Sequence, residues 1–273
     1  AWAEAERSRI GEERFRREHE CEFLIFDETL INSINLADME GVPPVEVTGQ
    51  VRWFKRPTPG NTYLTSLDPA MGTGGDYAAI QVFELPSFEQ VAEWHHNTTP
   101  MNQQVRILQQ INKHIHDAIM EKDTTASPQI FYSMENNSIG EAALLRVMDI
   151  GEENIQGMFL SEPIRKGHRR KFRRGFNTTA KHKIDACTKF KELVENGKMK
   201  INSQLLISEL KDFVASGMSY KAKAGQHDDL VSSCLLMTRM MKVLADFDPK
   251  IFEKWTDRTS ELKPMPVFGS FYG

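Results

Sequence analysis

The sequence is poor in cysteine and has no long apolar run, and these two absences exclude several classes of protein. It has three cysteines, an odd number without CxxC or mixed Cys/His spacing, which argues against a disulfide framework and a zinc site. No apolar run approaches the roughly 20 residues that a membrane span needs, and no signal peptide is visible. We therefore expect a soluble intracellular protein without a membrane partner.

A phosphate-binding loop is also absent. The motif GxxxxGK[ST] occurs nowhere in the chain, so Asp27 and Glu28, which follow an apolar run in the manner of a Walker B strand, are weak support for ATP binding. An ATPase motor is thus disfavoured, although a longer parent chain could contain the loop. Because the chain begins Ala-Trp-Ala without an initiator Met, we expect it to be a fragment of a longer protein.

The composition that is present is that of a globular protein, with 40% hydrophobic and 26% charged residues, so a sizeable core is possible. The net charge of −4 gives no hint of a nucleic-acid partner, but the distribution of charge does. Nine Lys and Arg and no acid lie between positions 165 and 183. Phe172 and Phe176 interleave these cations, and Gly167 and Gly175 bracket them, which suggests a mobile basic hairpin.

This basic segment predicts a contact with nucleic acid. A cluster of one sign repels itself and usually meets an opposite charge, of which the DNA phosphate backbone is the most obvious. A solvated charged loop is the alternative. The candidate DNA-binding residues are Arg165, Lys166, Arg169, Arg170, Lys171, Arg173, Arg174, Lys181 and Lys183.

Acidic residues stand at the ends of two predicted strands and at the start of a predicted helix. Asp68 and Glu135 each end a strongly apolar run and are followed by turn-forming residues. Asp228 and Asp229 precede apolar residues at helical spacing. Each acid alone has an ordinary structural explanation, because Asp is common in turns and at helix N-caps.

Taken together, these four acids predict a metal site. Sheets mixed with helices bind ligands beyond the carboxyl ends of their strands, so acids in such places can converge although they are far apart in sequence. Carboxylate oxygens are the ligands that Mg²⁺ and Mn²⁺ prefer.

The order of the predicted elements is that of an α/β, ribonuclease H-like fold with a mixed sheet flanked by helices. Strands near 62–68, 78–85 and 88–96 form an antiparallel meander, after which helices and strands alternate. In that topology the first strand lies centrally beside the fourth, in parallel, so that Asp68 and Glu135 emerge as neighbours. The later strands are predicted at 129–135, 155–160, 199–201 and 218–220.

Four parts are predicted along the chain. Residues 1–31 form a charged helical remnant of a preceding domain, and a Pro-rich linker at 32–61 joins it to the ribonuclease H-like domain at 62–245. The tail at 246–273 carries prolines and aromatic residues and would dock on a partner or on this domain.

Over residues 60–245 the motifs resemble the nuclease domain of the large terminase subunit of tailed bacteriophages, close to the T-even type. Each segment alone is modestly specific, but their order and spacing together are specific. Residues 1–31 resemble the end of the ATPase domain that precedes the nuclease in that family. The resembling segments are 67–76, 134–140, 178–181, 193–201 and 225–231.

The resemblance implies a metal-dependent endonuclease that hydrolyses duplex DNA with little sequence specificity and cuts concatemeric viral DNA during genome packaging. Two ions of Mg²⁺ or Mn²⁺ would be held by Asp68, Glu135 and the Asp228/Asp229 pair, and either Asp of the pair could ligate directly. The implied partners are double-stranded DNA, the portal, the small terminase subunit and an ATPase domain of the same parent chain. The implied location is the host cytoplasm.

One departure from the T-even pattern is visible, because Met71 stands where those relatives have Glu. A thioether is a poor ligand for Mg²⁺, so any auxiliary acid role falls to Asp76. His227 could orient a water or touch phosphate, although a His before a helix is more often a local hydrogen-bond partner. Lys181 and Lys183 are the basic residues expected near the scissile bond.

Two rival interpretations stay open from the sequence. Another ribonuclease H-like DNA nuclease, such as a junction resolvase or a transposase, would use the same acids, and a resolvase would prefer branched DNA. A non-catalytic DNA-binding or assembly module would use the acids only to cap helices and turns, and it would bind no divalent ion.

Overall fold

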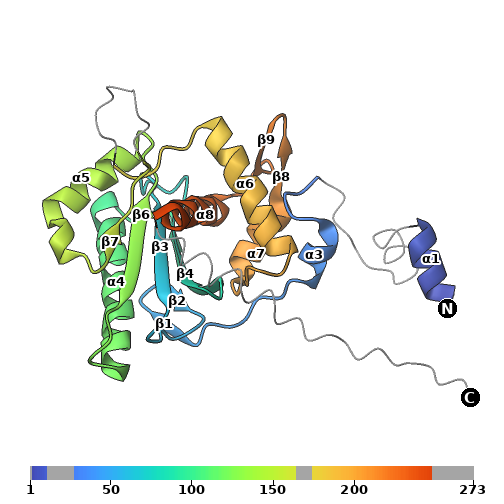
Figure 1. The fold of residues 1–273 in the computed structure, drawn as a ribbon. Coiled ribbons are helices and arrows are strands. Elements are labelled where there is room, and N and C mark those ends of the chain that lie inside the picture. The colour runs from blue at the N-terminus through green and yellow to red at the C-terminus, as the bar shows by residue number, and fades with distance from the viewer. Residues whose placement is uncertain (1, 11–27, 164–173, 248–273) are drawn as a thin grey trace, which may run out of the picture.

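A seven-stranded mixed sheet forms the centre of the computed structural model, which describes residues 2–10, 28–163 and 174–247. The strand order is β1-β2-β5-β4-β3-β6-β7 (Figure 1). The strands are β1 (Glu46–Thr48), β2 (Val51–Trp53), β3 (Thr62–Asp68), β4 (Ala78–Leu85), β5 (Glu89–His96), β6 (Gln129–Met134) and β7 (Met158–Phe159).

β3 lies inside this sheet, with β4 antiparallel on one side and β6 parallel on the other. β4 pairs in turn with β5, also antiparallel. The predicted meander and the predicted parallel pairing of the 62–68 strand with the 129–135 strand are therefore confirmed. Because Leu67 is in register with Met134, the carboxyl ends of β3 and β6 lie at the same edge of the sheet, which we call the acid edge.

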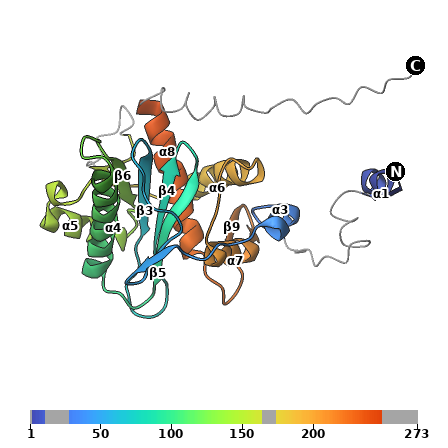
Figure 2. The same ribbon diagram turned by 90° about the horizontal axis from the view of Figure 1, so that it is seen from below.

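Helices cover both faces of the sheet, so the fold has three layers (Figure 2). Side chains alternate between the two faces along β3: Tyr63 and Leu67 belong to one buried cluster, and Leu64 belongs to the other. The helices of the first face are α4 (Met101–Lys122) and α5 (Gly140–Ile150), and those of the second are α6 (Ala180–Glu195), α7 (Gln204–Asp212) and α8 (Asp229–Phe247).

Local sequence explains why these elements form. Every residue of β4 is buried, including Gln81 and Glu84, as expected of a strand that is covered on both faces and is otherwise apolar. α4 buries Val105, Leu108 and Ile115 at helical spacing. α6 and α7 each begin at a hydroxyl N-cap, since Thr179 and Ser203 accept backbone N–H groups of their first turns.

The segment that was predicted as a linker, 32–61, contains regular elements. A short helix, α3 (Ser33–Asp38), is followed by the β1–β2 hairpin, and β2 pairs with β5 through Arg52 and Glu93. The two strands have three residues each, too few for a period-two pattern to be recognised among the neighbouring prolines. The division of the chain into four parts stays a prediction.

The predicted strand at 199–201 is wrong, because Lys200 makes only a single β-bridge, to Glu89. After Ile201, the backbone N–H groups of Asn202 and Ser203 donate to the side-chain oxygen of Gln90 and so do not extend a ladder. The strand predicted at 155–160 is the two-residue β7, preceded by a 3-10 turn, η1 (Glu152–Asn154). The strand predicted at 218–220 is present in the hairpin of β8 (Phe213–Ser216) and β9 (Ser219–Ala222).

Both ends of the chain are described only in part. α1 spans Trp2–Ile10, and the remainder of the predicted helical region up to residue 27 lies outside the described residues. α8 ends at Phe247, and the tail beyond it is also outside. Within the described ranges no helix has the length and apolarity required to cross a membrane.

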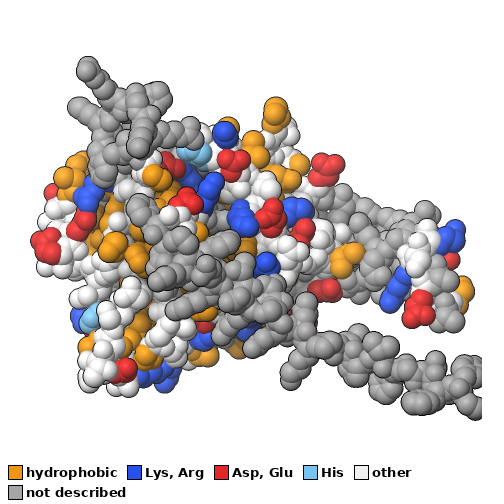
Figure 3. Space-filling model, in the orientation of Figure 1, with side chains coloured by type: hydrophobic (Ala, Val, Ile, Leu, Met, Phe, Trp, Pro, Cys, Tyr) orange, Lys and Arg blue, Asp and Glu red, His pale blue; other side chains and the backbone are white. Residues whose placement is uncertain are grey.

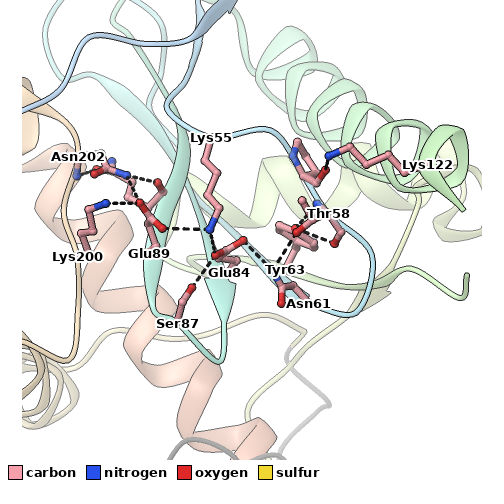
Figure 4. A network of polar contacts seen from close by, with 12 residues as sticks. Lys55, Thr58, Asn61, Tyr63, Glu84, Ser87, Glu89, Lys122, Lys200 and Asn202 are labelled. Carbon is pink, nitrogen blue, oxygen red and sulfur yellow. Dashed lines mark hydrogen bonds and ion pairs between the residues drawn. The ribbon is translucent and has the colours of Figure 1, made fainter. Parts of the chain in front are cut away.

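A polar network stabilises the end of the sheet opposite the acid edge (Figure 4). Lys55 Nζ contacts the Glu84 carboxylate and lies 3.1 Å from Glu89 Oε2, and Lys200 Nζ lies 2.6 Å from Glu89 Oε1. Glu84 is paired with Tyr63, near the start of β3, whereas Asp68 is at the end of that strand. The network therefore fixes strands and a loop at a distance from the acids.

Candidate metal centre

The two strand-end acids are neighbours at the acid edge. Asp68 is the last residue of β3, and Glu135 directly follows β6. The N–H of Glu135 donates to the carbonyl oxygen of Leu67 at 3.1 Å, which continues the parallel ladder up to the acids. Both acidic residues are half-buried. The structure thus brings together two residues that are 67 positions apart in the sequence.

Asp228 and Asp229, at the start of α8, are held beside strand β3. Asp228 directly precedes α8 and Asp229 is its first residue. One turn further on, Ser233 Oγ donates to the Ser66 carbonyl oxygen at 3.0 Å, while Ser66 Oγ donates to the Ser233 carbonyl oxygen at 2.8 Å. These buried reciprocal bonds hold the start of α8 beside the end of β3.

The electrostatics show how close the four carboxylates lie. The pKa of Asp68 is raised well above its usual range, first by burial, then by the charge of Glu135 and a hydrogen bond to it, and then by the charges of Asp229 and Asp228. Burial and the charge of Asp228 raise the pKa of Asp229 to about 6. Such an arrangement disfavours ionisation of Asp68 and Asp229 unless a cation compensates.

The donor set fits a divalent cation, although its side chains do not yet surround a common point. Within the described parts of the chain, no three His, Cys, Asp or Glu side chains already have the spacing of a metal site. Mg²⁺ and Mn²⁺ favour a set of oxygen ligands, which these four carboxyl groups can supply. Burial first, and then the charges of neighbouring acids, raise the pKa values of Asp68 and Asp229, and such shifts are common at functional sites.

Glu135 is oriented by a residue whose role the sequence did not reveal. Asn137 Nδ2 donates to Glu135 Oε2 at 3.1 Å, and Asn137 Oδ1 accepts the N–H groups of Ile139 and Gly140 at the start of α5. A Cβ at Gly140 would lie 1.8 Å from the Glu135 carbonyl oxygen, so only glycine permits this close approach. The sequence showed Asn137 only as a turn residue.

The auxiliary candidates lie around this group. His227 is exposed, and its Nδ1 lies 3.5 Å from Asp229 Oδ2. Asp76 is exposed and close enough to contribute to the raised pKa of Asp229. Lys183 Nζ lies 3.6 Å from Asp228 Oδ2, so its charge partly balances the acids.

The described residues on either side of 164–173, within or next to the basic segment, lie at the acid edge. Glu162 N–H donates to the Gly175 carbonyl oxygen at 3.2 Å, and Gly175 N–H donates to Ser161 Oγ at 3.1 Å. Phe176 forms a parallel bridge with Glu135. Residues 161–162 and 175–176 are therefore joined to each other, and Phe176 joins them to the end of β6 beside Glu135.

Three of the predicted DNA-binding residues can be located. Arg174 forms an ion pair with Glu152 and lies over the Phe159 ring, so its charge is already engaged. Lys181 is exposed in the first turn of α6, and Lys183 is half-buried near Asp228. The other six lie outside the described residues: Arg165, Lys166, Arg169, Arg170, Lys171 and Arg173.

The described surface near this site carries both signs of charge. In the space-filling view, Lys, Arg, Asp and Glu side chains are intermixed over α6 and α7 (Figure 3). A surface of mixed sign attracts DNA weakly, so the prediction of a DNA interface depends mainly on the segment 165–173.

Comparison with known proteins connects this geometry to a family. The family model of the terminase RNaseH-like domain matches residues 65–240, a range that contains all four acids. Among solved structures, the large terminase nuclease of thermophilic phage G20c with bound magnesium is 17% identical, with a TM-score of 0.57 over 78% of this chain and 97% of that chain.

Two further solved structures have the same fold. The large terminase nuclease domain of Thermus phage P74-26 is 17% identical, with a TM-score of 0.51 over 74% of this chain and 91% of that one. The human cytomegalovirus terminase nuclease domain, soaked with manganese and bound to an inhibitor, is 14% identical, with a TM-score of 0.50 over 77% of this chain and 94% of that one. The predicted ribonuclease H-like fold is confirmed, while the roles of single residues stay predictions.

Proposed function

The chain belongs to the family of terminase RNaseH-like domains, and from this premise we propose that it is a metal-dependent endonuclease that cuts concatemeric viral DNA during genome packaging. The observation that carries the proposal is the convergence of four carboxylates from β3, β6 and α8 at one edge of the sheet. If these acids only capped turns and helices, nothing in that role would offset the repulsion between their charges.

The residues that would hold two ions of Mg²⁺ or Mn²⁺ are Asp68, Glu135 and at least one of Asp228 and Asp229. When bound, such ions lower the pKa of a water that attacks the phosphodiester and stabilise the departing oxygen. The solved structures of phage G20c and human cytomegalovirus nucleases contain magnesium and manganese, which supports the use of a divalent ion here.

Other side chains would prepare this site for an anionic substrate. Asn137 holds the Glu135 carboxylate by a hydrogen bond and is itself held by the start of α5. Lys183 places a positive charge beside Asp228, where it would also attract a phosphate oxygen. His227 and Asp76 lie at the rim, where His227 would orient a water and Asp76 would serve as an auxiliary acid.

We propose that the substrate is duplex DNA and that cutting depends little on sequence. The support is the basic segment, because the described residues on either side of 164–173 are bonded to each other and to the backbone at Glu135. Contacts from Lys and Arg to phosphates position DNA but do not read its bases. In the packaging machine, we propose that the domain works in the host cytoplasm with a portal, a small terminase subunit and an ATPase domain of its own parent chain.

Plasmid cleavage tests this function. We expect the protein to linearise and then degrade a supercoiled plasmid in Mg²⁺ or Mn²⁺, to stop in EDTA, and to cut unrelated duplex sequences at similar rates. A preference for four-way junctions over plain duplex would instead indicate a resolvase. If cleavage is absent and calorimetry detects no Mn²⁺ binding, the chain is a non-catalytic module and the proposal is wrong.

A further inference from the structure

Glu209 is a buried acid directly behind the first turn of α8. It lies on α7, and only 10% of its side chain is exposed. Its Oε2 accepts the backbone N–H of Val231 at 3.1 Å, and the N–H of Leu230 also bonds to this carboxyl group. Both N–H groups belong to the turn that carries Asp228 and Asp229.

The hydrogen bonds from Leu230 and Val231 to Glu209 replace the usual side-chain N-cap of a helix. The first N–H groups of a helix have no partner within it, and the side chain of the residue before the helix is the common acceptor. In α8 that residue is Asp228, whose carbonyl oxygen accepts the Ser232 N–H at 2.7 Å. Because Glu209 accepts two of these N–H groups from a different helix, the Asp228 and Asp229 carboxylates are not needed as caps.

The other oxygen of Glu209 faces a set of stacked rings that also reaches Asp229. His95 Nε2 lies 3.7 Å from Glu209 Oε1, and burial lowers the pKa of His95 to about 4, so its ring is neutral. Tyr77 stacks on His95 at 4.1 Å and meets His227 edge-on at 4.8 Å. The backbone N–H of Tyr77 donates to Asp229. Glu209 therefore lies between the start of α8 and the residues that hold Asp229.

We propose that Glu209 is a positioning residue of the metal centre, which accepts the N–H groups of Leu230 and Val231 and thereby leaves Asp228 and Asp229 free to hold the cation. Glu209 acts as a hydrogen-bond acceptor and does not ligate the metal. This inference rests on the proposed function, because it assigns a purpose to the start of α8 only if that helix end binds metal.

Calorimetric titration with Mn²⁺ tests the inference through two substitutions. Glu209→Ala removes the acceptor, so we expect Mn²⁺ affinity to fall by about 10-fold or more, as is common when a residue that supports metal ligands is lost. Glu209→Gln keeps an acceptor oxygen and is expected to retain an affinity close to that of the wild type. The Mn²⁺ concentration for half-maximal plasmid cleavage should shift in parallel.

The matched control is Asn32→Ala, which removes a side-chain cap from α3, far from the acids in sequence. It should lower thermal stability but leave Mn²⁺ affinity unchanged. The comparison separates the general effect of losing a helix cap from the specific effect of losing Glu209 at the start of α8. Glu209→Asp, which keeps the carboxyl group but withdraws it by one methylene, serves if the Ala variant does not fold, and it too should bind Mn²⁺ more weakly.

Two outcomes would overturn the inference while leaving the proposed function intact. Wild-type Mn²⁺ affinity in Glu209→Ala or Glu209→Asp would show that the contact does not position the aspartates. An equal loss in the Gln and Ala variants would show that the carboxyl group itself is required, as in a ligand. A wild-type protein that binds no Mn²⁺ would, in contrast, remove the proposed function itself.

Discussion

Asp68→Asn is expected to reduce Mg²⁺-dependent plasmid cleavage by about 1,000-fold or more, because it removes one of the charges that would hold the ions. The folded state should survive the change. Burial and the neighbouring acids raise the pKa of Asp68, so the ionised carboxylate costs stability in the absence of a cation as pH rises through that pKa. The neutral amide removes this cost, and at neutral pH the metal-free variant should therefore unfold at a temperature no lower than that of the wild type.

The measurement combines cleavage rates with thermal unfolding followed by circular dichroism. Asp117→Asn is the matched control, since Asp117 is an exposed acid on α4 that pairs with Lys113. It should cut at the wild-type rate. Cleavage by Asp68→Asn within a few-fold of the wild type would remove Asp68 from the centre of the site.

Neutralising the basic segment should weaken DNA binding and reduce its dependence on salt. Replacing Arg169, Arg170 and Arg173 by Gln removes three potential phosphate contacts, each of which contributes about 0.9 to the slope of log K against log salt concentration. We therefore expect the slope to fall by up to about 2.7 if all three arginines contact phosphate. Arg174 is left unchanged, because its charge is already paired with Glu152.

The control for this experiment has the same change of net charge elsewhere on the molecule. Lys113, Lys189 and Lys198 are exposed, and their replacement by Gln should alter the slope little. Fluorescence anisotropy with a labelled duplex at several salt concentrations gives both slopes. Equal slopes for the wild type and the arginine variant would mean that the segment is only a solvated loop.

The strands that position the site could be predicted because their sequence pattern is strong. β3 and β4 are rich in apolar residues, the three strands β3, β4 and β5 have seven or eight residues each and are bounded by turn residues, and their predicted ranges differ little from the observed ones. The proximity of Asp68 and Glu135 could be predicted from the topology, because neighbouring parallel strands end at the same edge of a sheet. The short hairpin of β1 and β2 could not be found in this way, because three-residue strands carry too little periodicity.

The roles of Glu209 and Asn137, which support the acids, could not be predicted from the sequence for a different reason. Glu209 is a charged residue in a helix, and such residues usually face solvent; only the packing of α7 against α8 brings it to the Val231 N–H. Asn137 looked like a turn residue, and its contact with Glu135 depends on the geometry of the loop before α5. Hydrogen bonds between side chains and distant backbone groups leave no periodic signal in a sequence.

A crystal structure of the protein soaked in Mn²⁺ tests the central claim most directly, because manganese can be located by anomalous scattering. We predict two manganese peaks about 4 Å apart at the acid edge, with an Asp68 oxygen between them. Glu135 and at least one of Asp228 and Asp229 should complete the set of protein ligands. Absence of manganese between β3, β6 and α8 in crystals that bind the ion elsewhere would contradict the account.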